Sequence, residues 1–541
     1  MHALTAALVV LLISSSGAYA SLSRAERLRS ARVGPPRPTS KARVDFATFA
    51  ATTNATPTKD DFLVDGSKIP LVNFTVQNSY AGRLPISPTE SRKLFFWYWP
   101  SSAQGGSDSL TIWLNGGPGC SSMIGFLSEH GTFTFYPGTD APVVNPNAWS
   151  TVSDMLYVDQ PISTGYSAGT SDVDGEEDIA DQFYGFLLQF YAVFPELLSK
   201  KLFIAGESYA GLYVPYIANR ILTASAAEKQ ATPIDLQSIL INDGAWSTFY
   251  ISEFIPTSAF VTRNQNIFNF PSSYLSDLQA ASRTCQWDNV MDQLKYPPSG
   301  PFTFDGFTQA NADLGNCTDL TSAIQVSDDA TEINKCFNIY RITDKCPTPH
   351  DPIADYFSRS DVQELLHVPG FGKWEDCGGD VFPNGDNSDW SDTLFPSLIA
   401  SLPRGMTLWH GLDDLILLAN GTRITIQMLN WGGSQGFQSE PKEPIIINGE
   451  NKGIQHSERG LTYYEVPNAG HMIPSDQPEL ALEVFKTVLG KGSLLHTTAG
   501  ATSNSSKTGS GGSNGTGAAV FGTEISRAVV GLVAFVALII V

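Results

Sequence analysis

The sequence predicts an α/β fold with a mostly parallel central sheet, and three observations support this class. Strand-like and helix-like segments alternate from about residue 68 to residue 241, a pattern typical of parallel sheets. The motif GESYAG, residues 206–211, stands between a strand-like and a helix-like segment, as in a nucleophile elbow. A glycine-rich loop, residues 115–120, follows another strand-like segment. Ordinary turns also show the elbow pattern, so a reactive serine requires a base, an acid and an oxyanion hole elsewhere in the chain.

The individual elements follow from local periodicity. Apolar residues recur at helical spacing through residues 178–198, which predicts a helix packed on the sheet. The elbow motif is predicted to lead into a helix over residues 213–220. The predicted strands are residues 95–100, 109–116, 154–161, 202–205, 238–243, 405–411 and 462–467.

One stretch interrupts this pattern, from residue 246 to about residue 350. It is rich in Phe, Asn and Ser and holds four of the six cysteines. The α/β pattern resumes at residues 361–368. We therefore predict a single catalytic domain, residues 61–492, that carries a disulfide-stapled cap insertion.

The N-terminal residues read as a secretory signal followed by a basic segment. An apolar run precedes Ala18-Tyr19-Ala20, an A-x-A cleavage site, so we expect residues 1–20 to be a signal peptide. The run is too short to span a bilayer well. Residues 21–60 begin with a cluster of Arg and Lys. This segment is either a solvated, disordered leader or a propeptide that complements an acidic body.

The C-terminal residues predict an anchor. Residues 493–517 are rich in Ser, Thr and Gly, as in flexible linkers. Residues 518–541 include a run of only 14 apolar residues, whereas a spanning helix needs ~20. We expect a GPI-anchor signal that is removed, with attachment at Asn514, Gly515 or Gly517, and a tail-anchored helix is the alternative. The expected location is the cell surface, reached through the secretory pathway, at the plasma membrane or the cell wall.

Composition excludes several classes of partner. The formal net charge is −21, which disfavours nucleic acid as a partner.

Six cysteines in a secreted chain suggest three disulfides, with 15 possible pairings. Neither C-x-x-C nor H-E-x-x-H occurs, so we expect no zinc and no cofactor. Predicted N-glycosylation sites are Asn54, Asn73, Asn316, Asn420, Asn504 and Asn514.

The glycine-rich loop NGGPGC, residues 115–120, is the candidate oxyanion hole. Hydrolases with a nucleophile elbow take one backbone N–H from such a loop and one from the residue after the serine, here Gly117 and Tyr209. An ordinary glycine turn is the alternative. Phosphate binding is disfavoured because no Lys-Ser/Thr pair follows the loop.

Chain order indicates the base and the acid. In the elbow-containing fold the order is Ser, then Asp or Glu, then His. His471 lies in the loop after the last predicted strand, whereas His456 lies in a polar stretch and His496 in the tail. Asp413 and Asp414 both follow the predicted strand 405–411, and position alone does not separate them.

Four motifs together resemble the serine carboxypeptidase family: WLNGGPGCSS, DQPISTGYS, GESYAG and AGHMIPSDQP. The resemblance extends from Phe62 to Gly490 and includes NSYAGRLPIS. It implies an α/β-hydrolase fold with an inserted cap. It also implies hydrolysis of the C-terminal peptide bond of peptides, with release of one amino acid.

The resemblance also assigns roles to residues. Ser208 matches the nucleophile, His471 the base and Asp414 the acid, because the family aspartate stands three residues after a strand-end glycine, here Gly411. This chain has HGLDD where many members have Gly-Asp-x-Asp. The positions that bind the free carboxylate of the substrate are Trp113, Asn115, Glu129 and Glu207.

Glutamates bind an anion only when they are protonated, because a neutral carboxyl can donate a hydrogen bond. Crowded carboxyls hold a proton more tightly, since adjacent like charges are unfavourable. The histidine must stay neutral to act as base, so activity also falls at very low pH. We therefore expect an acidic pH optimum.

The resemblance further implies disulfide pairing. Cys120–Cys377 matches a bridge common in the family, and we expect the remaining cysteines to nest as Cys285–Cys346 and Cys317–Cys336. Two alternative functions keep the same fold. One is an acyltransferase that passes the acyl group to an alcohol, and the other is a non-catalytic surface protein.

Overall fold

The computed structural model of the protein describes residues 57–87, 91–136, 138–303, 321–347, 351–492 and 494. Several predictions fall outside these residues. They are the signal peptide, most of the basic segment, most of the linker, the anchor signal with Gly515 and Gly517, Cys317, His496, and the sequons at Asn54, Asn316, Asn504 and Asn514. Within the described part, no helix is both long enough and apolar enough to cross a bilayer.

The described residues form an 11-stranded sheet with the strand order β1-β2-β3-β7-β4-β8-β9-β10-β15-β14-β13. The centre of the sheet, from β7 to β15, is parallel, and both edges are antiparallel. The strands are β1 (Leu63–Val64), β2 (Ser79–Pro85), β3 (Lys93–Trp99), β4 (Ser109–Leu114), β7 (Asp154–Asp159), β8 (Lys201–Glu207), β9 (Leu236–Asn242), β10 (Met406–Gly411), β13 (Glu443–Ile447), β14 (Glu450–Glu458) and β15 (Leu461–Val466). The predicted fold class, an α/β-hydrolase with a mostly parallel sheet, is confirmed.

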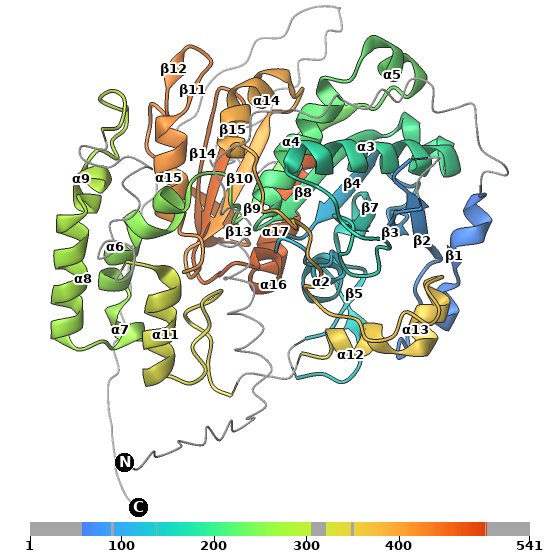
Figure 1. Ribbon diagram of the computed structural model, residues 1–541, viewed down its shortest axis with the longest axis horizontal. Helices are drawn as coiled ribbons and strands as arrows, with labels where there is room; N and C mark the ends of the chain where they lie inside the picture. The colour runs from blue at the N-terminus through green and yellow to red at the C-terminus, as the bar shows by residue number, and fades with distance from the viewer. Residues whose placement is uncertain are drawn as a thin grey trace, which may run out of the picture. The chain divides into compact units, whose positions relative to one another are not determined.

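Helices cover both faces of the sheet (Figure 1). On one face, alternate strand residues such as Phe96 pack against Phe190 of α3, with ring centroids 5.6 Å apart. On the other face, Trp113 packs against Trp149, which stacks on Phe485 of α17. The helices of this domain are α2 (Met123–Gly125), α3 (Glu176–Val193), α4 (Ala210–Leu222), α5 (Ala226–Ala231), α12 (Ile353–Ser358), α13 (Ser360–Leu365), α14 (Phe395–Ser401), α15 (Ala419–Met428), α16 (Ile473–Asp476) and α17 (Pro478–Leu489).

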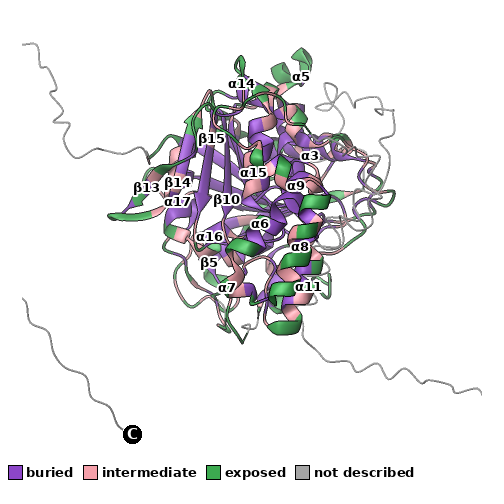
Figure 2. Ribbon diagram, turned by 90° about the vertical axis from the view of Figure 1, so that its left-hand side faces the viewer, coloured by how far each residue is buried: buried purple, intermediate pink, exposed green. Residues whose placement is uncertain are grey.

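Residues 246–303 and 321–347, from the first part of the segment between β9 and β10, contribute a helical cap. Figure 1 shows its helices gathered on one side of the sheet. A π-helical turn, Tyr250–Phe254, leads into them and packs on α15 together with Trp287. Figure 2 shows buried central strands and exposed residues mostly on the outer surfaces of helices such as α8. The cap helices are α6 (Ile255–Arg263), α7 (Gln265–Phe268), α8 (Ser272–Thr284), α9 (Trp287–Asp292) and α11 (Ala323–Ile333).

One of the three predicted disulfides is present, and the other two predicted pairings are contradicted. Cys120 is bonded to Cys377 across a sequence separation of 257 residues. Cys336 is bonded to Cys346, only 10 residues away. The predicted Cys285–Cys346 and Cys317–Cys336 bridges are therefore wrong. The chain turns back after α11, so Cys346 meets Cys336, which lies close to it in sequence. The predicted nested pairing of the four cap cysteines does not form. Cys285 is also disulfide-bonded, and its partner lies outside the described residues.

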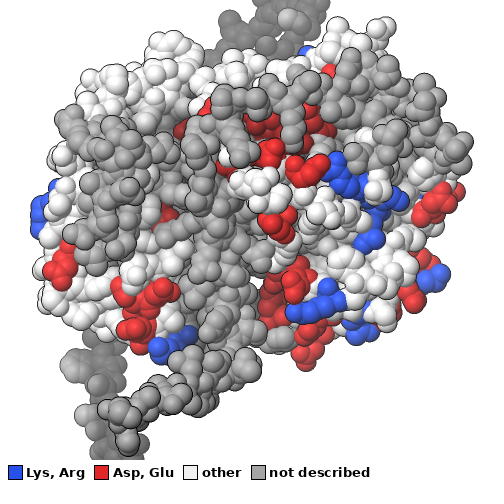
Figure 3. Space-filling model, in the orientation of Figure 1, with Lys and Arg blue, Asp and Glu red and all other residues white. Residues whose placement is uncertain are grey.

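The surface carries the acidic charge expected from composition. Figure 3 shows Asp and Glu side chains gathered over the middle of one face, with Lys and Arg mostly to one side of them. Such a face repels phosphate backbones and attracts cations.

Candidate active site

Ser208 occupies a strained turn between β8 and α4. Its φ is +65°, a left-handed conformation that is uncommon for a residue other than glycine. Its carbonyl accepts hydrogen bonds from the N–H groups of Gly211 (2.8 Å) and Ala245 (2.9 Å). A Cβ at residue 211 would lie 2.7 Å from the Ala245 nitrogen, so glycine is required there. The turn thus holds Ser208 at the end of a central strand, at the edge of a pocket.

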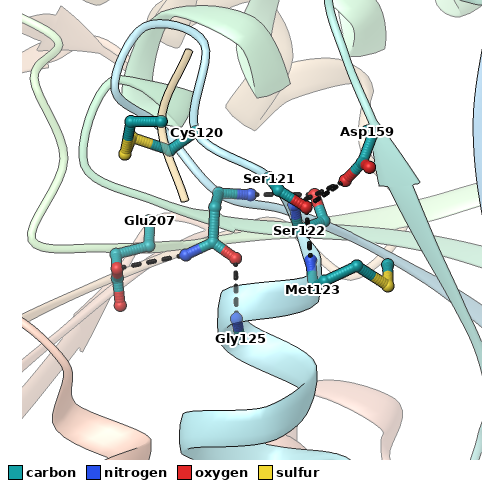
Figure 4. Close-up of a disulfide and its surroundings, with 9 residues drawn as sticks. Cys120, Ser121, Ser122, Met123, Gly125, Asp159 and Glu207 are labelled. Atoms are coloured by element: carbon teal, nitrogen blue, oxygen red, sulfur yellow. Dashed lines mark hydrogen bonds between the residues drawn. A yellow bond between two sulfur atoms is a disulfide. The ribbon is translucent and has the colours of Figure 1, made fainter. Parts of the chain in front are cut away.

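The glycine-rich loop is fixed from both sides. Its Cys120 is bonded to Cys377 (Figure 4). The Ser121 N–H also donates to the Asp376 carbonyl at 2.8 Å. The Asp159 carboxylate, at the end of β7, accepts from Ser121 Oγ at 2.5 Å and from the Ser122 N–H at 3.0 Å. Burial raises the pKa of Asp159 to about 6. The motif containing Asp159 therefore serves to hold the loop.

The loop approaches the elbow closely enough to form an oxyanion hole. A Cβ at residue 116 would lie 2.3 Å from the Tyr209 nitrogen and 2.7 Å from Ser208 Cβ. Gly117, the predicted first donor, has a φ of +114° and lines the same pocket as Ser208. Only a glycine at position 116 lets the two backbones come this close.

His471 pairs with Asp414 and not with Asp413. The His471 Nδ1–H donates to Asp414 Oδ2 at 2.7 Å, and both side chains are buried. Two backbone N–H groups, of Ile416 and Leu417, donate to the other oxygen of Asp414. Asp413 instead accepts from Thr343 Oγ1 of the cap at 2.7 Å. Because Nδ1 carries the proton that Asp414 binds, Nε2 is the basic nitrogen.

Glu207, which precedes Ser208 in the chain, lies beside a second buried carboxyl group, that of Glu129. Glu129 lies on a π-helical turn, Phe126–His130, and is 3% exposed. Burial, and then the adjacent Glu207 charge, raise the pKa of Glu129 well above its ordinary value. Glu207 accepts from the side-chain amides of Asn115 (3.4 Å) and Asn242 (2.8 Å). These donors favour the ionised form of Glu207, so the proton of the pair resides on Glu129.

The two other predicted substrate residues support each other. The Trp113 Nε1–H donates to Asn115 Oδ1 at 2.8 Å, and the Gly125 N–H donates to the same oxygen at 3.0 Å. This fixes which end of the amide is the oxygen and turns the nitrogen of Asn115 toward Glu207. Trp113 is fully buried, so it orients Asn115 from behind and does not line the pocket.

The pocket is partly apolar. Ile124, Met472 and Tyr340 line it together with the polar groups. Tyr340 comes from the cap, on the segment closed by Cys336–Cys346, and its carbonyl accepts from the His471 N–H at 2.8 Å. The cap therefore forms one wall of the site.

Three polar residues at this site were not predicted from the sequence. Asn242 Nδ2 donates both to Glu207 Oε2 and, at 3.0 Å, to the His471 carbonyl. Asp243 and His410 are buried behind Asp414. Asn242 and Asp243 stand where β9 ends, and polar residues at that end of a central parallel strand are a signal that could have revealed them.

The remaining predictions within the described residues fall elsewhere. His456 lies on β14 and contacts Glu458, away from the pocket. Asn73 is exposed, whereas Asn420 is half-buried in α15. One ligand atom each of Asp243, Asp414 and His471 lie within 4.8 Å of one another. The 2.7 Å hydrogen bond already joins two of these residues, so we interpret the group as an acid–base cluster.

Comparisons with known proteins agree with this geometry. The serine carboxypeptidase family model matches residues 70–491. A probable serine carboxypeptidase from Arthroderma benhamiae is 36% identical over 471 residues, covering 80% of this chain and 86% of that protein. Serine-type carboxypeptidase F from Aspergillus niger is 33% identical over 475 residues, covering 79% and 86%. A crystal structure of Kex1Δp, a prohormone-processing carboxypeptidase from Saccharomyces cerevisiae, has a TM-score of 0.65 at 25% identity, covering 80% of this chain and 96% of that chain.

Proposed function

The chain belongs to the serine carboxypeptidase family, and we propose that Ser208, Asp414 and His471 are its catalytic triad. The protein is a serine-type carboxypeptidase, which acts on the C-termini of peptides.

In the proposed first step, His471 Nε2 takes the proton of Ser208 Oγ while Oγ attacks the carbonyl carbon of the last peptide bond. The N–H groups of Gly117 and Tyr209 stabilise the oxyanion that forms, which is commonly the largest single catalytic contribution. Asp414 stabilises the imidazolium through Nδ1. His471 then returns the proton to the nitrogen of the departing amino acid. Water then replaces the departed amino acid: His471 takes a proton from water while the water oxygen attacks the acyl carbon. The bond to Ser208 Oγ breaks, and His471 returns the proton to Oγ.

The proposed carboxylate site is formed by Asn115, Glu129 and Glu207, with Trp113 holding Asn115. Below its raised pKa, Glu129 is neutral and donates a hydrogen bond to the substrate carboxylate. As the pH rises through that pKa, Glu129 loses its proton and repels the same carboxylate. Peptide binding is therefore strongest in acid, which supports the proposed acidic optimum.

One observation carries this proposal. Asn242 Nδ2 donates to the His471 carbonyl and to Glu207, so one side chain joins the proposed triad to the proposed carboxylate site. A substrate whose free end sits at Glu129 and Glu207 therefore has its last peptide bond next to Ser208. This spacing favours release of a single residue.

The test compares one blocked dipeptide with a free C-terminus and the same dipeptide as an amide. We expect the free acid to be cleaved at least tenfold more efficiently near pH 5, and the difference to shrink as the pH rises. Ser208→Ala should abolish turnover of both and serves as the control for contaminating activity. Equal cleavage of acid and amide at every pH would contradict the carboxylate site. Appearance of an ester when an alcohol is added, without free acid, would indicate an acyltransferase.

We also propose that the chain is secreted and held at the cell surface by a GPI anchor. The support comes from the sequence of residues 1–20 and 493–541 alone. Treatment of intact cells with a phosphatidylinositol-specific phospholipase should release the enzyme into the medium. Retention on membranes that release a known GPI-anchored protein would exclude this anchor.

A further inference from the structure

A second acidic side chain, Asp243, lies behind the proposed triad. It follows β9 directly and is 0% exposed. One of its carboxylate oxygens lies within 4.8 Å of a carboxylate oxygen of Asp414 and a ring nitrogen of His471. The mechanism above gives Asp243 no task, although a buried acid beside a catalytic acid is energetically unfavourable if both are charged.

The hydrogen bonds of Asp243 are unequal. Its Oδ1 accepts from the Gly411 N–H at 2.8 Å and lies 3.2 Å from His410 Nε2. Its Oδ2 is buried and has no hydrogen-bond partner within the described residues. The facing carboxylate of Asp414 is also an acceptor. Two acceptor groups that face each other without a donor between them are satisfied by one shared proton.

His410 does not supply a compensating positive charge. It lies inside β10 and is buried. The Nε2–H donates to the Leu417 carbonyl at 2.5 Å, and Nδ1 lies 2.9 Å from Thr422 Oγ1, so the neutral ring has a partner at each nitrogen. Burial lowers the pKa of His410. The imidazole therefore brings no positive charge to Asp243, and its one N–H proton is already bound to the Leu417 carbonyl.

The other groups around Asp243 are also acidic or neutral. Glu207 faces it from β8, and Asp414 and His471 face it from the loops after β10 and β15. Glu465 of β15 faces His410 but is paired with Arg423. Within the described part of the chain, neither Asp243 nor Asp414 forms an ion pair with Lys or Arg. Burial, and then the Asp414 charge, raise the pKa of Asp243 well above its ordinary value.

We propose that Asp243 is a positioning residue that stays protonated in the working enzyme and donates its hydroxyl proton to the Asp414 carboxylate. This inference rests on the triad proposed above. The added hydrogen bond takes up part of the negative charge that Asp414 would otherwise direct at His471. The imidazolium is then less stabilised, so His471 gives up its proton at a lower pH. The pair thereby keeps the catalytic base neutral in the acidic range where the carboxylate site binds best.

The experiment uses the full chain and measures how fast a fluorophosphonate labels Ser208 between pH 3 and pH 8. This probe reads the Ser–His pair and carries no carboxylate, so Glu129 and Glu207 do not enter. Asp243→Leu has nearly the same shape but no donor, and its acid limb should move to higher pH by about one unit. Asp243→Asn keeps a donor toward Asp414, and its acid limb should stay at the wild-type position.

Two results would overturn the proposal. If Asp243 is charged, both substitutions remove a negative charge and both acid limbs move to lower pH. If Asp243 is merely structural, thermal stability falls and neither limb moves. Should Asp243→Leu fail to fold, Asp243→Asn still decides between the neutral and the charged form. Absence of labelling at Ser208 in the wild-type enzyme would instead refute the proposed triad, so the two failures are distinguishable.

Discussion

The proposed active centre contains two pairs of buried carboxyl groups, and the two pairs differ in what they face. Glu207 lines the pocket, and Glu129 lies next to Glu207. Asp243 and Asp414 lie behind the imidazole of His471, and neither lines the pocket. In each pair one member accepts from at least two N–H donors and the other does not.

Because the two pairs face different groups, we expect each pair to change a different kinetic parameter as the pH changes. A pair that meets the substrate carboxylate changes its interaction with substrate when it ionises, so pH acts through KM. A pair that lies behind the base changes the ease with which His471 accepts a proton, so pH acts through the rate of acylation. Because macroscopic pKa values belong to each pair as a unit, the kinetic parameters must be separated to see the distinction.

The largest expected effect comes from Asp414→Asn, which tests the pair behind His471. The substitution removes the charge that holds the Nδ1 proton of His471, and loss of a triad aspartate costs roughly four orders of magnitude in kcat. KM for a free-acid peptide should change little, because the pocket pair is untouched. Steady-state kinetics near the optimum measure both parameters.

Asp413→Asn is the matched control, because Asp413 bonds to Thr343 and does not contact His471. We expect its kcat to stay within about threefold of wild type, the size typical of a surface change. A large loss in Asp413→Asn together with a small one in Asp414→Asn would reverse the assignment of the acid.

The second prediction concerns Glu129→Gln. In the wild type, the pair gains a second negative charge as Glu129 ionises, so KM for a free-acid peptide rises with pH. The amide cannot ionise and still donates a hydrogen bond, so KM should become nearly constant between pH 5 and pH 8. At pH 7.5 we expect it to be roughly tenfold below wild type, which corresponds to one unit in pKa.

The peptide amide provides the control for Glu129→Gln. Its KM should not respond to the substitution, since it brings no carboxylate to the pocket. If the wild-type KM for the free acid is already independent of pH, the pocket pair does not control binding.

The sequence predicted the central sheet well because local pattern determines it. The strand before the elbow was predicted over residues 202–205 and is β8, Lys201–Glu207. The predicted helix 178–198 instead ends at Val193 and continues as a 3₁₀ turn, because Pro195 cannot donate the next helical hydrogen bond. The cap helices were not predicted, since they pack on one another and on α15 without a clean period.

The site residues could be predicted from the sequence only where they lie in a recognisable motif. Ser208 and His471 lie in recognisable motifs, and the structure brings both to one pocket. Asn242, Asp243 and His410 belong to no such motif. Their contacts depend on the strand order β8-β9-β10, which joins segments more than 160 residues apart in sequence. That long-range order is a property of the folded sheet and not of any local window.

The smallest expected effect comes from Asn242→Ala, which separates the two pairs. Asn242 donates to Glu207 of one pair and to the backbone of His471, the partner of the other. Hydrogen bonds to charged groups contribute about 1.5–3 kcal/mol each, so we expect kcat/KM to fall by about tenfold, mostly through KM. Ser238→Ala on the same strand is the control, because Ser238 bonds to the Gly405 carbonyl at the opposite end of β9. Its substitution should lower thermal stability without changing KM. If Asn242→Ala and Ser238→Ala alter only stability, Asn242 supports the sheet and the two carboxyl pairs act independently of it.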